Sequence, residues 1–195
     1  METLTRLVSS LGGLYLLAIL LRFLLQVARA DFYNPISQSV VRITDPMVRV
    51  FRTFIPGYRG IDFSTLVLAL VVEAALVVIL NYLYGYQLPA AGEIITWSLA
   101  GLIFFIINIY YWSIIATIIM SFVMLFSGNV NPHPALQLLW QLTEPIMRPI
   151  RNIIPPMGGL DFSPIFIFIG IEFLKEFLFQ VFQVDGRMVA VTVGL

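Results

Sequence analysis

The stretch TEPIMRPIRNIIPPMGGLDFSP, residues 143–164, repeats TDPMVRVFRTFIPGYRGIDFST, residues 44–65, at an offset of ninety-nine residues. Both stretches are rich in charged residues and proline, and the same offset carries Glu73 onto Glu172. The identical pairs are Thr44/Thr143, Pro46/Pro145, Arg49/Arg148, Arg52/Arg151, Ile55/Ile154, Pro56/Pro155, Gly60/Gly159, Asp62/Asp161, Phe63/Phe162 and Ser64/Ser163. Chance similarity between apolar segments would match leucines and valines instead. The pattern therefore predicts an internal repeat.

The composition around these stretches is that of an integral membrane protein. Hydrophobic residues make up 59% of the 195 residues and charged residues 11%, with a mean hydropathy of +0.94. Soluble domains usually carry about 25% charged residues. No long polar stretch remains from which a separate soluble domain could be built. The absence of cysteine excludes disulfides and thiolate nucleophiles.

Four apolar blocks are long enough to cross a bilayer, at about residues 11–28, 64–83, 96–126 and 163–182. The third is too long for one upright span, so we expect one long tilted helix. The first block resembles a cleaved signal peptide, but Arg22 interrupts its apolar run. The third block occupies the same position in the second half, and an internal span cannot be a signal peptide. Four transmembrane helices are therefore expected.

Each half of the chain reads as span, basic loop, span. The first half covers residues 1–90 with its loop at 30–63, and the second covers 91–195 with its loop at 127–162. Both halves then enter the membrane in the same direction. The expected fold is an all-α integral membrane protein built from two tandem parallel helical hairpins, each with a short amphipathic interfacial helix.

The repeated loop has the residues of a short amphipathic helix. Thr44 and Thr143 precede an acid and a proline, which predicts a helix N-cap followed by a first turn. Beyond this start the charged residues fall on one helical stripe and apolar residues on the other. The charged stripes are Asp45, Arg49 and Arg52 in the first copy, and Glu144, Arg148 and Arg151 in the second. An Ile-Pro step ends each helix, and Ser163 with Pro164 is expected to cap the next span.

Two partners are open for the four repeated arginines. One is the phosphate of an anionic lipid, because each basic residue near such a surface contributes ~1 kcal/mol. The other is the pair of aspartates, Asp62 and Asp161, which return to the same interface after the Ile-Pro turn. The candidate lipid- or partner-binding residues are Arg49, Arg52, Arg148 and Arg151.

Charged residues inside the apolar blocks form the second candidate site, because each is costly in hydrocarbon unless paired or hydrated. Arg22 and Glu73 lie at similar expected depths, which predicts an ion pair that fixes helix packing. Glu172 has Lys175 three residues further along its own block. A proton or cation relay through these groups is the alternative.

The remaining candidate chemistry is weak. His133 is the only histidine and lies between prolines, where a lone imidazole without a second ligand is not a metal site. We find no set of nucleophile, base and orienting group, no phosphate loop and no nucleic-acid surface. We expect no enzymatic activity, no cofactor and no metal.

The pattern of Thr-acid-Pro, two arginines three residues apart, Ile-Pro and Gly-x-Asp-Phe-Ser before an apolar span resembles the repeat of the YggT family. The resemblance covers nearly the whole chain. The first copy departs from it at Val50 and Thr65, where the second has Pro149 and Pro164. Membership implies a small bacterial inner-membrane protein with a role in osmotic or envelope stress, cell division or assembly of membrane complexes. It implies no catalytic residue.

Arginine placement predicts the topology. The two long loops carry most of the arginines, whereas only Arg6 and Arg187 lie in the termini and none lies in the central turn. By the positive-inside rule the loops face the cytoplasm and both termini face the other side.

Two functions of different classes follow. The first is a non-enzymatic scaffold or stress-tolerance factor that binds anionic lipid or a membrane protein partner through its basic interfacial helices, with a homo-oligomer as a further possibility. The second is an oligomeric ion or solute conduit that uses Glu73 and Glu172. The repeated identity is concentrated in the loop rather than along the spans, which favours the first.

Overall fold

The computed structural model describes residues 2–57, 60–127, 133–154 and 161–195, and over these residues it contains helices and no β-strand. The helices are α1 (Glu2–Val27), α2 (Pro35–Arg52), α3 (Phe63–Leu83), α4 (Ala91–Ser127), α5 (Pro134–Ile153), α6 (Ser163–Val181) and α7 (Gly186–Val191). The all-helical class expected from the sequence is confirmed.

Three helices, α1, α3 and α4, are long and apolar enough to cross a membrane. α6 covers the expected fourth span. Its 19 residues include three charged ones, Glu172, Lys175 and Glu176, so it is too highly charged to belong to this group. α4 is one continuous helix of 37 residues, as expected for the third apolar block. At 1.5 Å per residue it is ~55 Å long.

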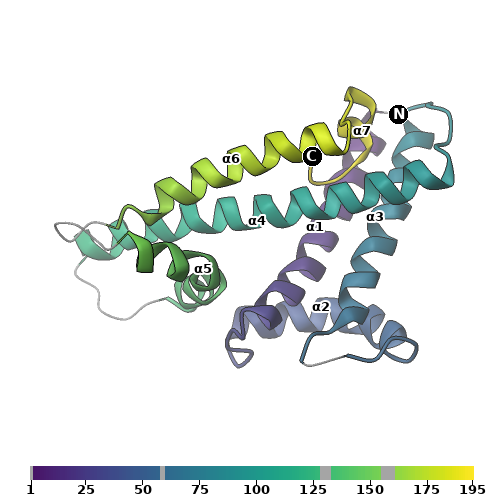
Figure 1. Ribbon diagram of the computed structural model, residues 1–195. Helices are drawn as coiled ribbons and strands as arrows, with labels where there is room; N and C mark the ends of the chain where they lie inside the picture. The colour runs from purple at the N-terminus through teal and green to yellow at the C-terminus, as the bar shows by residue number, and fades with distance from the viewer. Residues whose placement is uncertain (1, 58–59, 128–132, 155–160) are drawn as a thin grey trace.

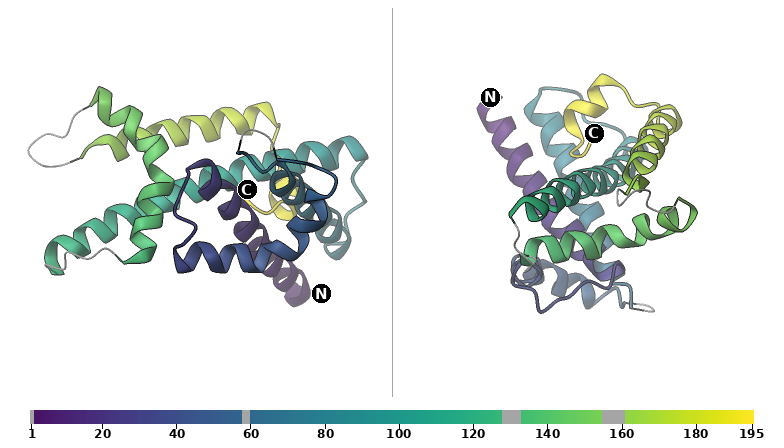
Figure 2. Two further views of the ribbon diagram at one scale, coloured as in Figure 1. Left: turned by 90° about the horizontal axis from the view of Figure 1, so that it is seen from below. Right: turned by 90° about the vertical axis from the view of Figure 1, so that its left-hand side faces the viewer.

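The helices form two pairs that cross steeply (Figure 1). α1 and α3 pack side by side with α2 across one end, and α4 and α6 pack side by side with α5 beside them. α2 and α5 lie on the same side of the molecule, and α7 lies on the opposite side (Figure 2). The two pairs meet where α4 packs against α3 and α5 against α1.

The main hydrophobic core lies at this junction. It contains buried leucines from both halves, among them Leu20 and Leu24 of α1, Leu68 of α3, Leu102 of α4 and Leu142 of α5. These residues come from helices that are apolar on every side, or from the apolar face of α5. The junction therefore fixes where the two basic helices lie relative to each other.

A second core cluster forms around α7. Met188 and Val191 pack with Val77 and Leu80 of α3 and with Phe104 of α4. The chain beyond α6 therefore folds back onto the first half instead of projecting away. Nothing in the repeated pattern predicts this, because residues 183–195 follow the second copy and have no counterpart in it.

Candidate interfacial site on α2 and α5

Both interfacial helices begin earlier than the sequence predicts. Asn34 caps α2, where its Oδ1 accepts a hydrogen bond from the Ile36 amide at 2.9 Å, and His133 caps α5, where its Nδ1 accepts from Ala135 at 3.2 Å. A proline follows each cap in the first turn. The prediction that Thr44 and Thr143 are N-caps is therefore wrong.

Thr44 and Thr143 instead lie inside their helices, buried against the protein. Thr44 Oγ1 donates to the Val40 carbonyl at 2.8 Å, and Thr143 Oγ1 donates to the Leu139 carbonyl at 2.8 Å. A threonine hydroxyl bonded to the carbonyl four residues earlier satisfies its polar group within a helix. The two helices are consequently 18 and 20 residues long and strongly amphipathic.

An arginine at the end of each interfacial helix is tied to the aspartate that precedes the next helix. Arg52 Nε donates to Asp62 Oδ2 at 2.9 Å, and Arg151 Nε donates to Asp161 Oδ2 at 2.8 Å. Arg151 also pairs with Glu144 at 2.9 Å. The pairing of these arginines with the two aspartates, one of the two alternatives, is therefore what the structure contains.

Hydroxyl and amide donors complete each aspartate site. Asp62 accepts from the Ser64 hydroxyl and, at 3.0 Å, from Thr65 Oγ1, while the Ser163 amide donates to Asp161 at 2.9 Å. Burial alone would raise the pKa of both aspartates. Hydrogen bonds from these donors and the arginine charge outweigh it, so the pKa of each carboxyl lies below its usual value.

The structure places only some of the other repeated prolines, glycines and serines where the sequence predicts them. Pro56 follows α2 on the surface, and Gly60 adopts a positive φ of 82°, which favours glycine. Pro155 and Gly159 lie outside the described residues. Ser163 is the first residue of α6 and not its cap, which is Phe162. Pro46 and Pro145 lie inside α2 and α5 and are exposed.

Arg22 connects α1 to α2 and does not pair with Glu73. Its guanidinium donates to Thr44 Oγ1 at 2.9 Å and to Asp45 Oδ1 at 3.1 Å, and its side chain is only 6% exposed. Burial alone would raise the pKa of Asp45, but hydrogen bonds and charges from Arg22 and Arg49 lower it. The predicted Arg22–Glu73 pair is wrong because the long arginine side chain extends toward α2.

The remaining charged residues of the apolar blocks have three different environments. Glu73 is fully buried and accepts a hydrogen bond from the Val193 amide at 2.9 Å. Glu172 is exposed on α6. Lys175 lies over the Tyr111 ring, with its Nζ 4.9 Å from the ring centroid. The repeated glutamates therefore do not have equivalent surroundings.

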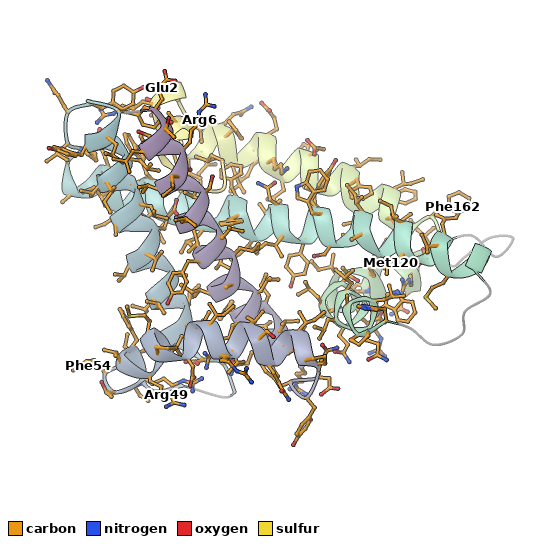
Figure 3. The ribbon with its side chains drawn as sticks, turned by 180° about the vertical axis from the view of Figure 1, so that it is seen from behind. Glu2, Arg6, Arg49, Phe54, Met120 and Phe162 are labelled. Atoms are coloured by element: carbon orange, nitrogen blue, oxygen red, sulfur yellow. The ribbon has the colours of Figure 1, made fainter. Side chains whose placement is uncertain are left out.

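Arg49 and Arg148 remain as the outward-facing members of the repeated set. Arg49 is 77% exposed and, within the part of the chain that the structure describes, its ionic partner is Asp45, one helical turn away at 2.6 Å. Figure 3 shows it near one end of α2, on the outer surface. Arg148 is exposed, has no ionic or hydrogen-bonded partner among the described residues, and lines an open hollow with Ala28 and Gln141. Both guanidinium groups therefore face outward, Arg49 as part of an ion pair within its helix and Arg148 with no partner among the described residues.

Hydrogen bonds between the two halves hold the starts of α2 and α5 together. Asn34 Nδ2 donates to the Pro134 carbonyl at 2.8 Å, and the Asp31 amide donates to Gln141 Oε1 at 2.9 Å. Sequence reasoning missed this contact. Its signal is the helix start at His133-Pro134, which matches Asn34-Pro35 at the same offset as the rest of the repeat.

Over the residues that the structure describes, no group of three or more histidine, aspartate or glutamate side chains is placed to hold a metal. The repeated arginines form a cationic surface on α2 and α5 that is fixed by ion pairs.

Comparison with known proteins supports the family resemblance. The family model described as CCB3/YggT matches residues 1–83 and 96–182. The chain is 39% identical to the uncharacterized protein PA0392 of Pseudomonas aeruginosa, over 85% of this chain and 82% of that protein. It is 35% identical to the uncharacterized protein YggT of Escherichia coli K12, over 96% of this chain and 95% of that protein. No solved structure matches the chain. The chain therefore belongs to the CCB3/YggT family.

Proposed function

We propose that the protein is a non-enzymatic inner-membrane scaffold or stress-tolerance factor that binds anionic lipid, or a membrane protein partner, through α2 and α5. The observation that carries the proposal is that the two arginines of each repeat have different surroundings. Arg52 and Arg151 are tied to the aspartates that precede the next helix, whereas Arg49 and Arg148 face outward, Arg49 while paired with Asp45 of its own helix. An anchored amphipathic helix with an exposed guanidinium is suited to hold a phosphate or carboxylate at the membrane surface.

In this proposal the protein has four spans arranged as two tandem repeats, with α6 as the fourth. Support comes from the helix starts, because α5 begins ninety-nine residues after α2 and α6 begins one hundred after α3. The arginine-rich loops lie in the cytoplasm and both termini outside. Glu2 and Arg6 lie at one end of the α1–α3 pair, and Arg49 and Phe54 lie at the other (Figure 3).

The surroundings of the two glutamates favour this function over a conduit. A conduit formed by two repeats would use Glu73 and Glu172 in similar settings. Glu73 is instead buried against the main chain of Val193, while Glu172 is exposed on α6. The arginine–aspartate pairs, by contrast, occur in both halves with nearly equal geometry.

The test is to remove the outward-facing charges of Arg49 and Arg148 and to leave Arg52 and Arg151 in place. Arg49→Gln with Arg148→Gln should lower binding to vesicles that contain phosphatidylglycerol by about tenfold or more, because each charge contributes ~1 kcal/mol at such a surface. The same variant should fail to rescue a strain that lacks the gene under osmotic shock, while the protein still accumulates in the membrane.

Arg6→Gln is the matched control, because Arg6 is exposed at the opposite end of α1. It should leave vesicle binding and rescue unchanged. Full vesicle binding and full rescue by the Arg49/Arg148 variant would refute the proposal. Ion flux in proteoliposomes that is lost with Glu73→Gln and Glu172→Gln would support a conduit instead.

A further inference from the structure

Residues 191–195 pack against the long helices, with Val191 and Thr192 buried and residues 193–195 half-buried. Asp185 caps α7 by accepting from the Met188 amide at 2.7 Å, and the chain becomes extended at Thr192. Met188, Val191 and Thr192 are each no more than 4% exposed. Figure 1 shows this segment lying against α3 and α4. The surroundings of residues 191–195, formed by Gly13, Glu73, Gly101, Phe105 and Asn108, are called the slot below.

The slot contacts the main chain of this segment at two successive residues. Glu73 Oε1 accepts from the Val193 amide at 2.9 Å, and Asn108 Nδ2 donates to the Gly194 carbonyl at 2.8 Å. Glu73 belongs to α3 in the first half and Asn108 to α4 in the second. Residues 193 and 194 form a turn, and because both contacts are to backbone groups, the slot recognises the main chain of this turn more than any one side chain.

Close packing restricts which peptide fits. A Cβ atom at Gly194, where φ is 126°, would lie 2.7 Å from the Gly101 carbonyl oxygen. A Cβ at Gly101 would collide with Glu73 Oε1 and with the Thr192 side chain. Only glycine meets both the backbone angle and the space at position 194. The slot is therefore specific in shape as well as in hydrogen bonding.

The bound state also leaves polar atoms without partners. Among the described residues, Glu73 Oε2 and Thr192 Oγ1 are buried and have no hydrogen-bond partner, and both belong to this contact. Buried polar atoms that lack partners destabilise the state that buries them. Withdrawal of the segment frees Thr192 from this environment but also removes the hydrogen bonds that Glu73 and Asn108 make to it. The packing and these two hydrogen bonds therefore stabilise the contact, and the unpartnered atoms oppose it.

We propose that the slot is a recognition site for the main chain of a short turn-forming peptide and that residues 191–195 are its resident, reversibly bound ligand. When the segment is bound, it bridges α3 of the first half and α4 of the second. It therefore works as a latch between the two helix pairs. This site is separate from the arginines of α2 and α5 and goes beyond the function proposed for them.

The direct test offers the segment as a separate molecule. A variant that lacks residues 186–195, purified in mild detergent, should bind a fluorescent peptide of the sequence GRMVAVTVGL. A peptide with Gly194→Leu should bind at least about tenfold more weakly, because of the clash with Gly101. A peptide with Val189→Ala is the control and should bind equally, since Val189 is 43% exposed. Equal binding of the Gly194→Leu peptide, or equal binding by the intact protein, would overturn the proposal.

Amide hydrogen exchange on the intact chain keeps the test valid if the shortened variant does not fold. The Val193 amide should exchange at least about tenfold faster than amides in the middle of α3, because the latch opens without global unfolding. Glu73→Leu should accelerate exchange at Val193 further. Glu73→Gln retains an acceptor oxygen and should leave that rate within about twofold. Exchange at Val193 that is as slow as in α3 would show a permanent part of the core and not a bound ligand.

Discussion

Arginines that look equivalent in the sequence have three different roles in the structure. Arg22 is buried between α1 and α2, Arg52 and Arg151 are tied to aspartates, and Arg49 and Arg148 are exposed. The sequence predicted the aspartate pairs as one of two alternatives, because the spacing returns each acid to the interface. It could not predict the partner of Arg22, since two acids at different depths were within reach of one flexible side chain.

The contact between Arg22 and Asp45 gives a prediction about stability. Arg22→Leu or Asp45→Leu alone should lower the free energy of unfolding by about 2–3 kcal/mol. Asp45→Leu leaves the buried Arg22 without its ionic partner, and Arg22→Leu leaves Asp45 with only the exposed Arg49 among the described residues. The double variant should recover part of this loss in denaturant unfolding of the purified protein. Additive losses would contradict the contact. Combining Arg22→Leu with Glu73→Leu is the control, in which no recovery is expected.

The two aspartates that precede α3 and α6 predict an acid-sensitive interface. The folded pKa of each lies below the value of about 3.9 for an unfolded aspartate, so the pairing stabilises the fold above that pH. The stabilisation should disappear as the pH falls from about 4 through the lower folded pKa. Thermal unfolding between pH 7 and pH 2.5 should show the loss. Asp62→Asn with Asp161→Asn should be less stable at pH 7 and should respond less in that window; an unchanged pH response would argue against these groups.

At the scale of elements, the sequence predicts α2 and α5 as short helices with N-caps at Thr44 and Thr143, but the observed N-caps, Asn34 and His133, lie ten residues earlier. Two start signals compete in each loop, an Asn-Pro or His-Pro step and a Thr-acid-Pro step. The Thr-acid-Pro step does not begin the helix, because Pro46 and Pro145 are tolerated within it. Both prolines lie on the exposed face, where the carbonyl that each leaves without a hydrogen bond can bond to water or head groups. The periodicity of the charges was read correctly, but the start of the helix was not.

The observed caps give a prediction for these elements. Asn34→Ala and His133→Ala should each cost about 1 kcal/mol of stability, because each removes the acceptor for the first-turn amide. His133→Asn should be neutral or stabilising, since asparagine is among the preferred caps. Arg42→Ala, exposed on α2, is the control and should stay within about 0.5 kcal/mol. A loss from Arg42→Ala as large as from Asn34→Ala in thermal unfolding would contradict the role of the caps.

At the scale of the whole molecule, the chain without cysteine allows the proposed topology to be tested with single cysteines. Ser39 is exposed on α2, and Gln87 is exposed in the turn between the halves. Ser39→Cys should react with a membrane-impermeant maleimide only when the cytoplasmic side is accessible, and Gln87→Cys should react in intact spheroplasts. The reverse labelling pattern would refute the assignment of sides.

Composition and the spacing of apolar blocks were enough to predict a helical membrane protein and the place of each long helix. They were not enough to predict the steep crossing of the two pairs, because that depends on how α3, α4 and α5 pack at Leu68, Leu102 and Leu142. The return of residues 191–195 to Glu73 was also missed. Its anchors are main-chain groups, and no side-chain pattern encodes those.

The length of α4 links the shape of the protein to the thickness of its membrane. A helix of ~55 Å cannot stand upright in a hydrocarbon layer of ~30 Å, so its tilt depends on that thickness. Lateral tension thins a bilayer and lays such a helix flatter, whereas a thicker bilayer raises it. Because the packed core at Leu68, Leu102 and Leu142 holds α4 against α3, a change in the tilt of α4 would turn the α1–α3 pair with it.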